Sequence, residues 1–136
     1  MKKNNILNLL LILVALMATS CHPGVVIALQ NNSGQDLVVV GLNHNLEETK
    51  ETVGKNRVIT IGVFYELRVE HKNGEWNYDS KPISPEFQKK KNFNVSVIGL
   101  QIEKDGAIYV LSPGTKGPVS SLPPQPDGYP LVPRAR

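Results

Sequence analysis

ITIGVFYELRVEHKNGEWNY, residues 59–78 of the 136-residue chain, holds its clearest β-pattern. Every second residue from Ile59 to Val69 is apolar or aromatic, as in a half-buried strand whose successive side chains point to opposite faces. Gly62 is expected to mark a bend or bulge in that strand. Asn73-Gly74 then predicts a hairpin, because a type I′ turn needs positive φ at both central residues. The expected register pairs Lys72 with Glu75, His71 with Trp76, and Val69 with Tyr78.

Two apolar runs before this stretch predict another hairpin. Residues 25–30 and 37–42 are rich in β-forming residues, and the turn residues Asn31-Asn32-Ser33-Gly34 lie between them. Residues 43–56 are polar and show no clear apolar stripe, so they predict a loop.

A third hairpin is expected after the central stretch. Within residues 93–102 the apolar side chains change face midway, which predicts a β-bulge near Ile98-Gly99 or a strand that crosses between sheets. Asp105-Gly106 is a second type I′ signal. Its expected register pairs Ile102 with Tyr109 and Leu100 with Leu111.

Together these patterns predict an all-β domain over residues 25–112, an antiparallel β-sandwich of six to eight strands with a small β-barrel as the alternative. Seven of the ten prolines lie between Pro113 and Pro133, so residues 113–136 predict an extended tail. Two interpretations of this tail stay open. Either it is an arm that contacts a partner or a neighbouring copy, or it fills gaps in its own domain. The apolar residues concerned are Leu122, Tyr129, Leu131 and Val132.

The first twenty residues have the features of a secretory signal peptide. Lys2 and Lys3 precede an apolar run over residues 6–18, and small residues follow it. The run is shorter than the roughly 20 apolar residues that a membrane-spanning helix needs. It leads to Cys21, the only cysteine of the chain.

The segment Ala18-Thr19-Ser20-Cys21 resembles the lipobox of bacterial lipoproteins, although Ala18 stands where leucine is commonest. The resemblance implies cleavage of residues 1–20, attachment of a diacylglyceryl group to the Cys21 sulfur, and acyl chains such as palmitate on the mature N-terminus, residues 21–24. Sorting to the inner membrane in that family often depends on Asp after the cysteine. His22 stands there, which implies the periplasmic face of the outer membrane.

Charge and side-chain chemistry narrow the function further. Without Lys2 and Lys3, the 15 basic residues fall to 13 against 12 acidic ones, so the near-neutral domain gives no reason to expect a nucleic-acid partner. Hydrolase, phosphate-binding and zinc-protease motifs are missing from the sequence. His44 and Glu48 have metal-ligand spacing but lack a third ligand. We therefore expect no enzymatic activity, no cofactor and no metal.

Lys89-Lys90-Lys91 either contacts lipid headgroups or, as we prefer, protects the following strand from aggregation.

Three classes of function remain to be compared. The first is a non-catalytic envelope lipoprotein that acts through contacts with another protein. The second is a ligand-binding or hydrolase-inhibitor module, and the third, least favoured by the motifs, is a cell-wall hydrolase.

Overall fold

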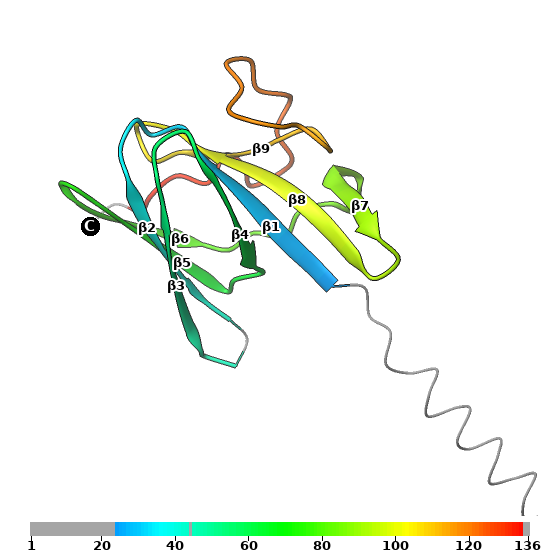
Figure 1. Cartoon of the computed structure of the whole chain (residues 1–136), viewed down its shortest axis with the longest axis horizontal. Helices are drawn as coiled ribbons and strands as arrows, with labels where there is room; N and C mark the ends of the chain where they lie inside the picture. Colours follow the sequence, from blue (N-terminus) through cyan, green and yellow to red (C-terminus); the bar gives the residue numbers. More distant parts are fainter. Residues whose placement is uncertain (1–23, 44, 135–136) are drawn as a thin grey trace, which may run out of the picture.

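The computed structural model describes residues 24–43 and 45–134, which form two β-sheets packed face to face (Figure 1). The five-stranded sheet has the order β4 (Val58–Gly62), β1 (Gly24–Asn31), β8 (Val95–Ile102), β7 (Gln88–Asn92), with β9 (Ile108–Val110) also paired to β8. The four-stranded sheet has the order β3 (Glu48–Val53), β2 (Leu37–Leu42), β5 (Glu66–His71), β6 (Gly74–Asp79). Most neighbours are antiparallel, but β1 and β8 are parallel. A 3₁₀ turn, η1 (Pro85–Phe87), precedes β7.

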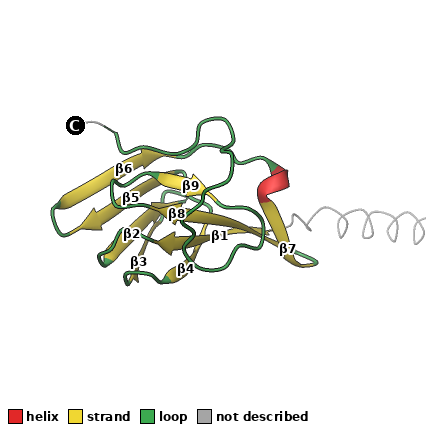
Figure 2. Cartoon of the chain, turned by 90° about the horizontal axis from the view of Figure 1, so that it is seen from above, coloured by secondary structure: helices red, strands yellow, loops and turns green. Residues whose placement is uncertain are grey.

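The all-β sandwich prediction is confirmed, since the two sheets remain separate layers and do not close into a barrel (Figure 2). The described residues contain nine strands, one more than the predicted upper limit.

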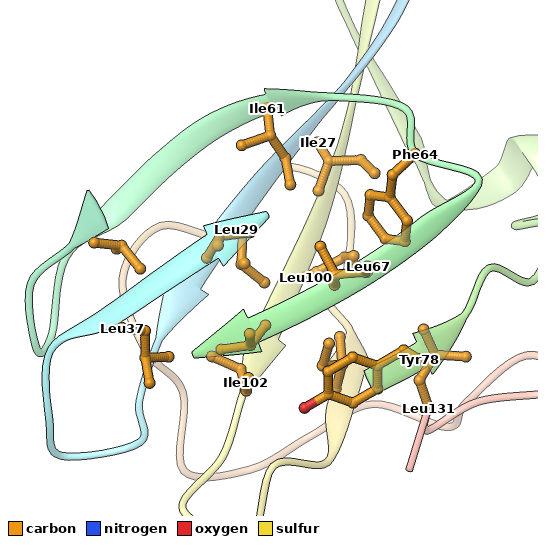
Figure 3. Close-up of a cluster of buried hydrophobic side chains, with 14 of the residues drawn as sticks. Ile27, Leu29, Leu37, Ile61, Phe64, Leu67, Tyr78, Leu100, Ile102 and Leu131 are labelled. Carbon is orange, nitrogen blue, oxygen red and sulfur yellow. The ribbon is translucent and has the colours of Figure 1, made fainter. Parts of the chain in front are cut away.

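The core lies between the sheets (Figure 3). Leu29 and Leu100 from one sheet meet Leu67 from the other, and all three are almost completely buried. Each such side chain contributes about 1.5–3 kcal/mol by leaving water. Tyr78 is also buried, and its hydroxyl donates a hydrogen bond of 2.6 Å to the Gly106 carbonyl. Burial, helped by the charge of Asp105, raises the pKa of the Tyr78 phenol well above its ordinary value.

The predicted hairpin between residues 25–30 and 37–42 is wrong, because β1 and β2 belong to different sheets. The turn residues between them connect the two layers. Asn31 fixes this crossing: its buried amide donates to the carbonyls of Gln35, Val53 and Gly54 at 2.8–3.1 Å. Its Oδ1 accepts hydrogen bonds from Ser33. Both runs are continuously apolar, so the sequence pattern could not show which sheet each one joins.

The long strand predicted from Ile59 to Val69 is divided into β4 and β5. β4 ends at Gly62, where a bend was expected, and the chain then crosses to the other sheet. At the crossing the alternation shifts: Phe64 enters the core, whereas Val63 and Tyr65 are exposed. The apolar alternation therefore held within each strand and failed at the connection.

The β5–β6 hairpin exists, but its register differs from the prediction. His71 pairs with Gly74 around Lys72 and Asn73, and neither of these two turn residues has positive φ. Instead Gly74 takes the positive value, φ 142°, so the turn is not type I′. The observed pairs are Val69 with Trp76 and Leu67 with Tyr78. A shift by two keeps every side chain on its expected face, so Tyr78 still reaches the core, while Trp76 is half-buried.

The β8–β9 register is also wrong, and here the faces change. Glu103 bonds Ala107 across a three-residue loop that ends at Gly106, φ 83°, a type I turn followed by a left-handed residue. Ile102 pairs with Ile108, and Leu100 pairs with Val110. A shift by one residue exchanges the faces, so Ile108 and Val110 are buried and Tyr109 is not fully buried.

Two further predictions need correction. β8 pairs with β1 without interruption, so the bulge expected near Ile98-Gly99 is absent from β8, and the irregularity lies in β7 between Lys90 and Asn92. Residues 43–56 are not only a loop, because they include β3. This polar edge strand has no apolar stripe since five of its six residues are exposed.

The proline-rich tail packs on its own domain. The Gln101 side chain bonds both backbone groups of Val119 at 2.8 Å, and the Gln125 side chain bonds both backbone groups of Val110. Further along, Leu131 pairs with Ile108 of β9, and the Arg134 amide donates to Asn77 of β6. The tail thus joins the two sheets along one side of the sandwich and satisfies strand edges there.

Candidate functional site

Cys21 and the lipobox-like residues before it lie outside the described residues. The described fold starts at Gly24, the first residue of β1, and its amide donates to the Asn94 carbonyl at 2.6 Å. Three residues of chain reach at most about 11 Å. Any group attached to Cys21 is therefore held close to the beginning of β1.

Strand pairing shows which other segments lie at this end of the sandwich, which we call the proximal end (Figure 1). β8 begins there with Val95, the partner of Gly24, and the β7–β8 turn at residues 93–94 precedes it. β4 also ends there, because Gly62 pairs with Val26. In the second sheet the Tyr65 amide donates to the Leu42 carbonyl at the end of β2. Of the described residues, the proximal end therefore comprises 24–25, 42–43, 45–48, 62–66 and 92–95.

Large apolar side chains are exposed mainly at the proximal end. Phe93 is fully exposed at the β7–β8 turn, and 74% of Leu46 is exposed in the loop between β2 and β3. Val63 and Tyr65 are exposed where the chain passes from β4 to β5. Among the described residues the other exposed large apolar side chains are Val58 and Val132.

The opposite, distal end comprises residues 31–36, 54–57, 72–73 and 103–106. Polar groups tie its loops together: besides the bonds of Asn31, the Asn32 side chain donates to the Glu103 carboxylate at 2.9 Å, and the Lys55 amide donates to Asp36. A buried polar group needs such partners. The two ends of one sandwich thus differ in chemistry.

Two surface cavities flank the exposed crossing at Val63. One of about 110 Å³ lies between that segment and the end of β2, and one of about 350 Å³ lies toward Asp79 and Ser80. The lining of the first is mainly apolar, with Ile61 and Phe64 at its base. The hollows add apolar surface to the proximal end.

The structure separates the four tail residues proposed as partner contacts. Leu131 is buried in its own domain, which favours the gap-filling interpretation for this residue. Tyr129 packs against the core, and its hydroxyl donates to the Lys81 carbonyl at 3.0 Å, while burial raises the pKa of its phenol to about 12. Leu122 is half-buried, and only Val132 is exposed. The interpretation in which the tail fills its own domain is the one that fits.

The spacing of His44 and Glu48 as metal ligands is not tested, because His44 lies outside the described residues. Glu48 lies 3.7 Å from the Arg68 guanidinium. His71 stacks on Trp76 with ring centroids 4.0 Å apart. Within residues 24–43 and 45–134, no three His, Cys, Asp or Glu side chains gather as metal ligands would.

Lys89, Lys90 and Lys91 lie on β7, which is an edge strand with four of its five residues exposed. The sequence drew attention to this run but not to Phe93 beside it. The sequence did contain a signal for an exposed Phe93, because this residue lies between two asparagines directly after the lysine run. Leu46 carried a weaker signal, because it lies in a segment predicted only as a loop.

The chain matches no protein-family model, no curated protein and no solved structure. In the part of the chain that the structure describes, no helix has the length and apolar character needed to cross a membrane.

Proposed function

We propose that this protein is a non-catalytic lipoprotein, anchored through acyl chains on Cys21 at the periplasmic face of the outer membrane, that acts by contacting another envelope protein. The lipobox resemblance of Ala18-Thr19-Ser20-Cys21 supports the anchor, and the short distance between Cys21 and the fold decides how the domain would be held. β1 begins three residues after the cysteine, so the acyl chains would hold the sandwich directly at the bilayer. Two or more acyl chains give stable anchoring, whereas one binds only marginally.

The edges of the sheets favour a protein contact at β4. An unpaired edge accepts a strand from another chain unless charge or a covering segment prevents it. β3 carries Glu48, Lys50 and Glu51, β7 carries its lysines, and the tail bonds β6 and β9. β4, with the sequence VITIG, has no charge and forms an edge of its sheet. A partner strand would add beside β4.

Metabolic labelling with a fatty-acid analogue tests the anchor. Wild type should be labelled, and Cys21→Ala should not, because the sulfur is the site of attachment. Equal labelling of both chains would refute the anchor.

Photo-crosslinking in cells tests the contact. A crosslinker at Thr60 of β4 should give one discrete adduct, and a crosslinker at Thr52 of the charged β3 edge serves as the matched control. A crosslinker at Val58 should give the same adduct. Adding Thr60→Lys to that chain should remove the adduct, because a charge on an edge strand prevents pairing. An adduct with a muramidase would favour the inhibitor function, and turnover of cell-wall substrate by the purified protein would favour a hydrolase.

A further inference from the structure

The tip of the β7–β8 hairpin combines an exposed aromatic ring with two cations. The side chain of Phe93 has an exposed fraction of 103%, so it makes no packing contact that would explain a phenylalanine in a turn. Lys89, Lys90 and Lys91 precede it on β7 and are all exposed. A surface hollow of about 340 Å³ is lined by Lys90, Lys91, Asn92 and Phe93. Phe93, Lys90 and Lys91 therefore form one patch, which we call the hairpin tip, whereas the side chain of Lys89 lies beside Gly114 of the tail.

Edge protection explains only part of this patch. Lysines on an exposed edge strand prevent it from pairing with another chain, and β7 is such a strand. The same purpose would be defeated by an exposed phenylalanine at the next turn, because an exposed apolar residue favours association. The two features together suit a surface that is apolar inside and negatively charged outside.

A phospholipid bilayer has this chemistry. Aromatic side chains concentrate at the level of the headgroups, where an apolar ring can enter the acyl boundary. Lysines near an anionic leaflet gain electrostatic attraction that falls off within a Debye length. The ion pairs found among the described residues involve side chains other than these three lysines.

The position of the tip relative to the N-terminus provides the second, independent observation. Asn94, next to Phe93, accepts the 2.6 Å hydrogen bond from Gly24. Cys21 is three residues from Gly24, a distance of at most about 11 Å along the chain. A bilayer that holds Cys21 therefore lies within reach of Phe93.

We propose that the hairpin tip is a second membrane contact, in which Phe93 enters the interface and Lys90 and Lys91 bind anionic phospholipid headgroups. This contact rests on the proposed lipid anchor, which brings the tip to the bilayer. It would fix the orientation of the sandwich, since an anchor alone leaves the domain free to rotate.

Quenching by brominated lipids tests the contact in the anchored, full-length mature protein reconstituted into vesicles of phosphatidylcholine and phosphatidylglycerol. The only native tryptophan, Trp76, pairs with Val69 near the distal end and provides the unquenched reference. Phe93→Trp should add a strongly quenched emission. Val132→Trp, another exposed apolar position, is the matched control and should stay unquenched, because Pro133 lies beside Gly106 at the distal end.

The lysines are tested in the Phe93→Trp chain by changing Lys90 and Lys91 to Gln. Quenching should then fall by at least half in anionic vesicles and should no longer depend on phosphatidylglycerol. Quenching of Phe93→Trp no greater than that of Val132→Trp, in protein that floats with the vesicles, overturns the hairpin contact and leaves the anchor intact. A free Cys21 thiol, detected by maleimide labelling, refutes the anchor and with it the contact.

Discussion

The distal and proximal ends of the sandwich show what folding explains in this molecule and what it does not. At the distal end, Asn31 is completely buried and ties together the carbonyls of Gln35, Val53 and Gly54. At the proximal end, Leu46 and Phe93 extend into solvent. Leu46 even adopts φ 61°, a left-handed conformation that costs about 1–2 kcal/mol for a residue with a Cβ atom. The distal residues serve stability, whereas folding does not explain the exposed proximal ones, and the proposed contact with a bilayer would explain them.

The largest difference between the ends should appear on replacing an asparagine. Asn31→Ala leaves buried carbonyls unpaired, and we expect it to lower the free energy of unfolding by about 3 kcal/mol, measured by denaturant titration. The control at the proximal end is Asn92→Ala. Asn92 accepts only an exposed local bond from the Asn94 amide, so its loss should cost less than about 1 kcal/mol. Similar losses of unfolding free energy in both variants would show that the asparagines of the two ends do not differ in their contribution to stability.

A smaller effect is expected from Gly106 in the β8–β9 turn. Gly106→Ala would place a Cβ atom 2.8 Å from the Trp76 ring at φ 83°, and we expect a loss of about 2 kcal/mol. Gly117 has a similar φ of 74° with nothing near its Cβ position. Gly117→Ala therefore measures the backbone cost alone, about 1 kcal/mol. Equal losses would show that close packing under Trp76 contributes nothing.

Tyr129 gives a pH-dependent effect. Burial raises the pKa of its phenol from 10.0 to about 12, so the folded state favours the protonated form. The resulting stability is complete below the unfolded pKa and is lost as the pH rises from about 10 toward 12. The unfolding free energy of wild type should therefore fall more steeply across this range than that of Tyr129→Phe. Parallel curves would show that the phenol is solvated in the folded protein.

The smallest effect, of opposite sign, is expected at Leu46. Leu46→Gly removes the strained Cβ atom from an exposed position, so it should leave stability unchanged or raise it by about 0.5 kcal/mol. A loss above about 1 kcal/mol in denaturant titration would show that Leu46 packs in the fold.

The sequence predicted the layers better than their connections. Alternation identified the core residues Leu67 and Val69, because the period of two depends only on the local strand. The pairing of β1 with β4 and β8 could not be predicted, because a continuously apolar run does not indicate which strand it pairs with or in which register. The dipeptides Asn73-Gly74 and Asp105-Gly106 located both hairpins. In each hairpin the glycine follows the two central residues of the turn instead of being one of them, so both registers differ from the prediction. Of the site, the sequence offered Cys21 and the lysines. The exposure of Phe93 and Leu46 depends on tertiary structure and could not be read from composition.

The orientation of the sandwich on the bilayer can be measured with spin labels at its two ends. If Cys21 carries lipid, it has no free thiol, so Leu46→Cys and Asn73→Cys can each be labelled singly in the anchored protein. We predict that the label at residue 46 is accessible to oxygen but shielded from a water-soluble nickel chelate, and that the label at residue 73 is fully accessible to the chelate. Equal accessibility of both labels to the chelate would contradict a membrane-facing proximal end.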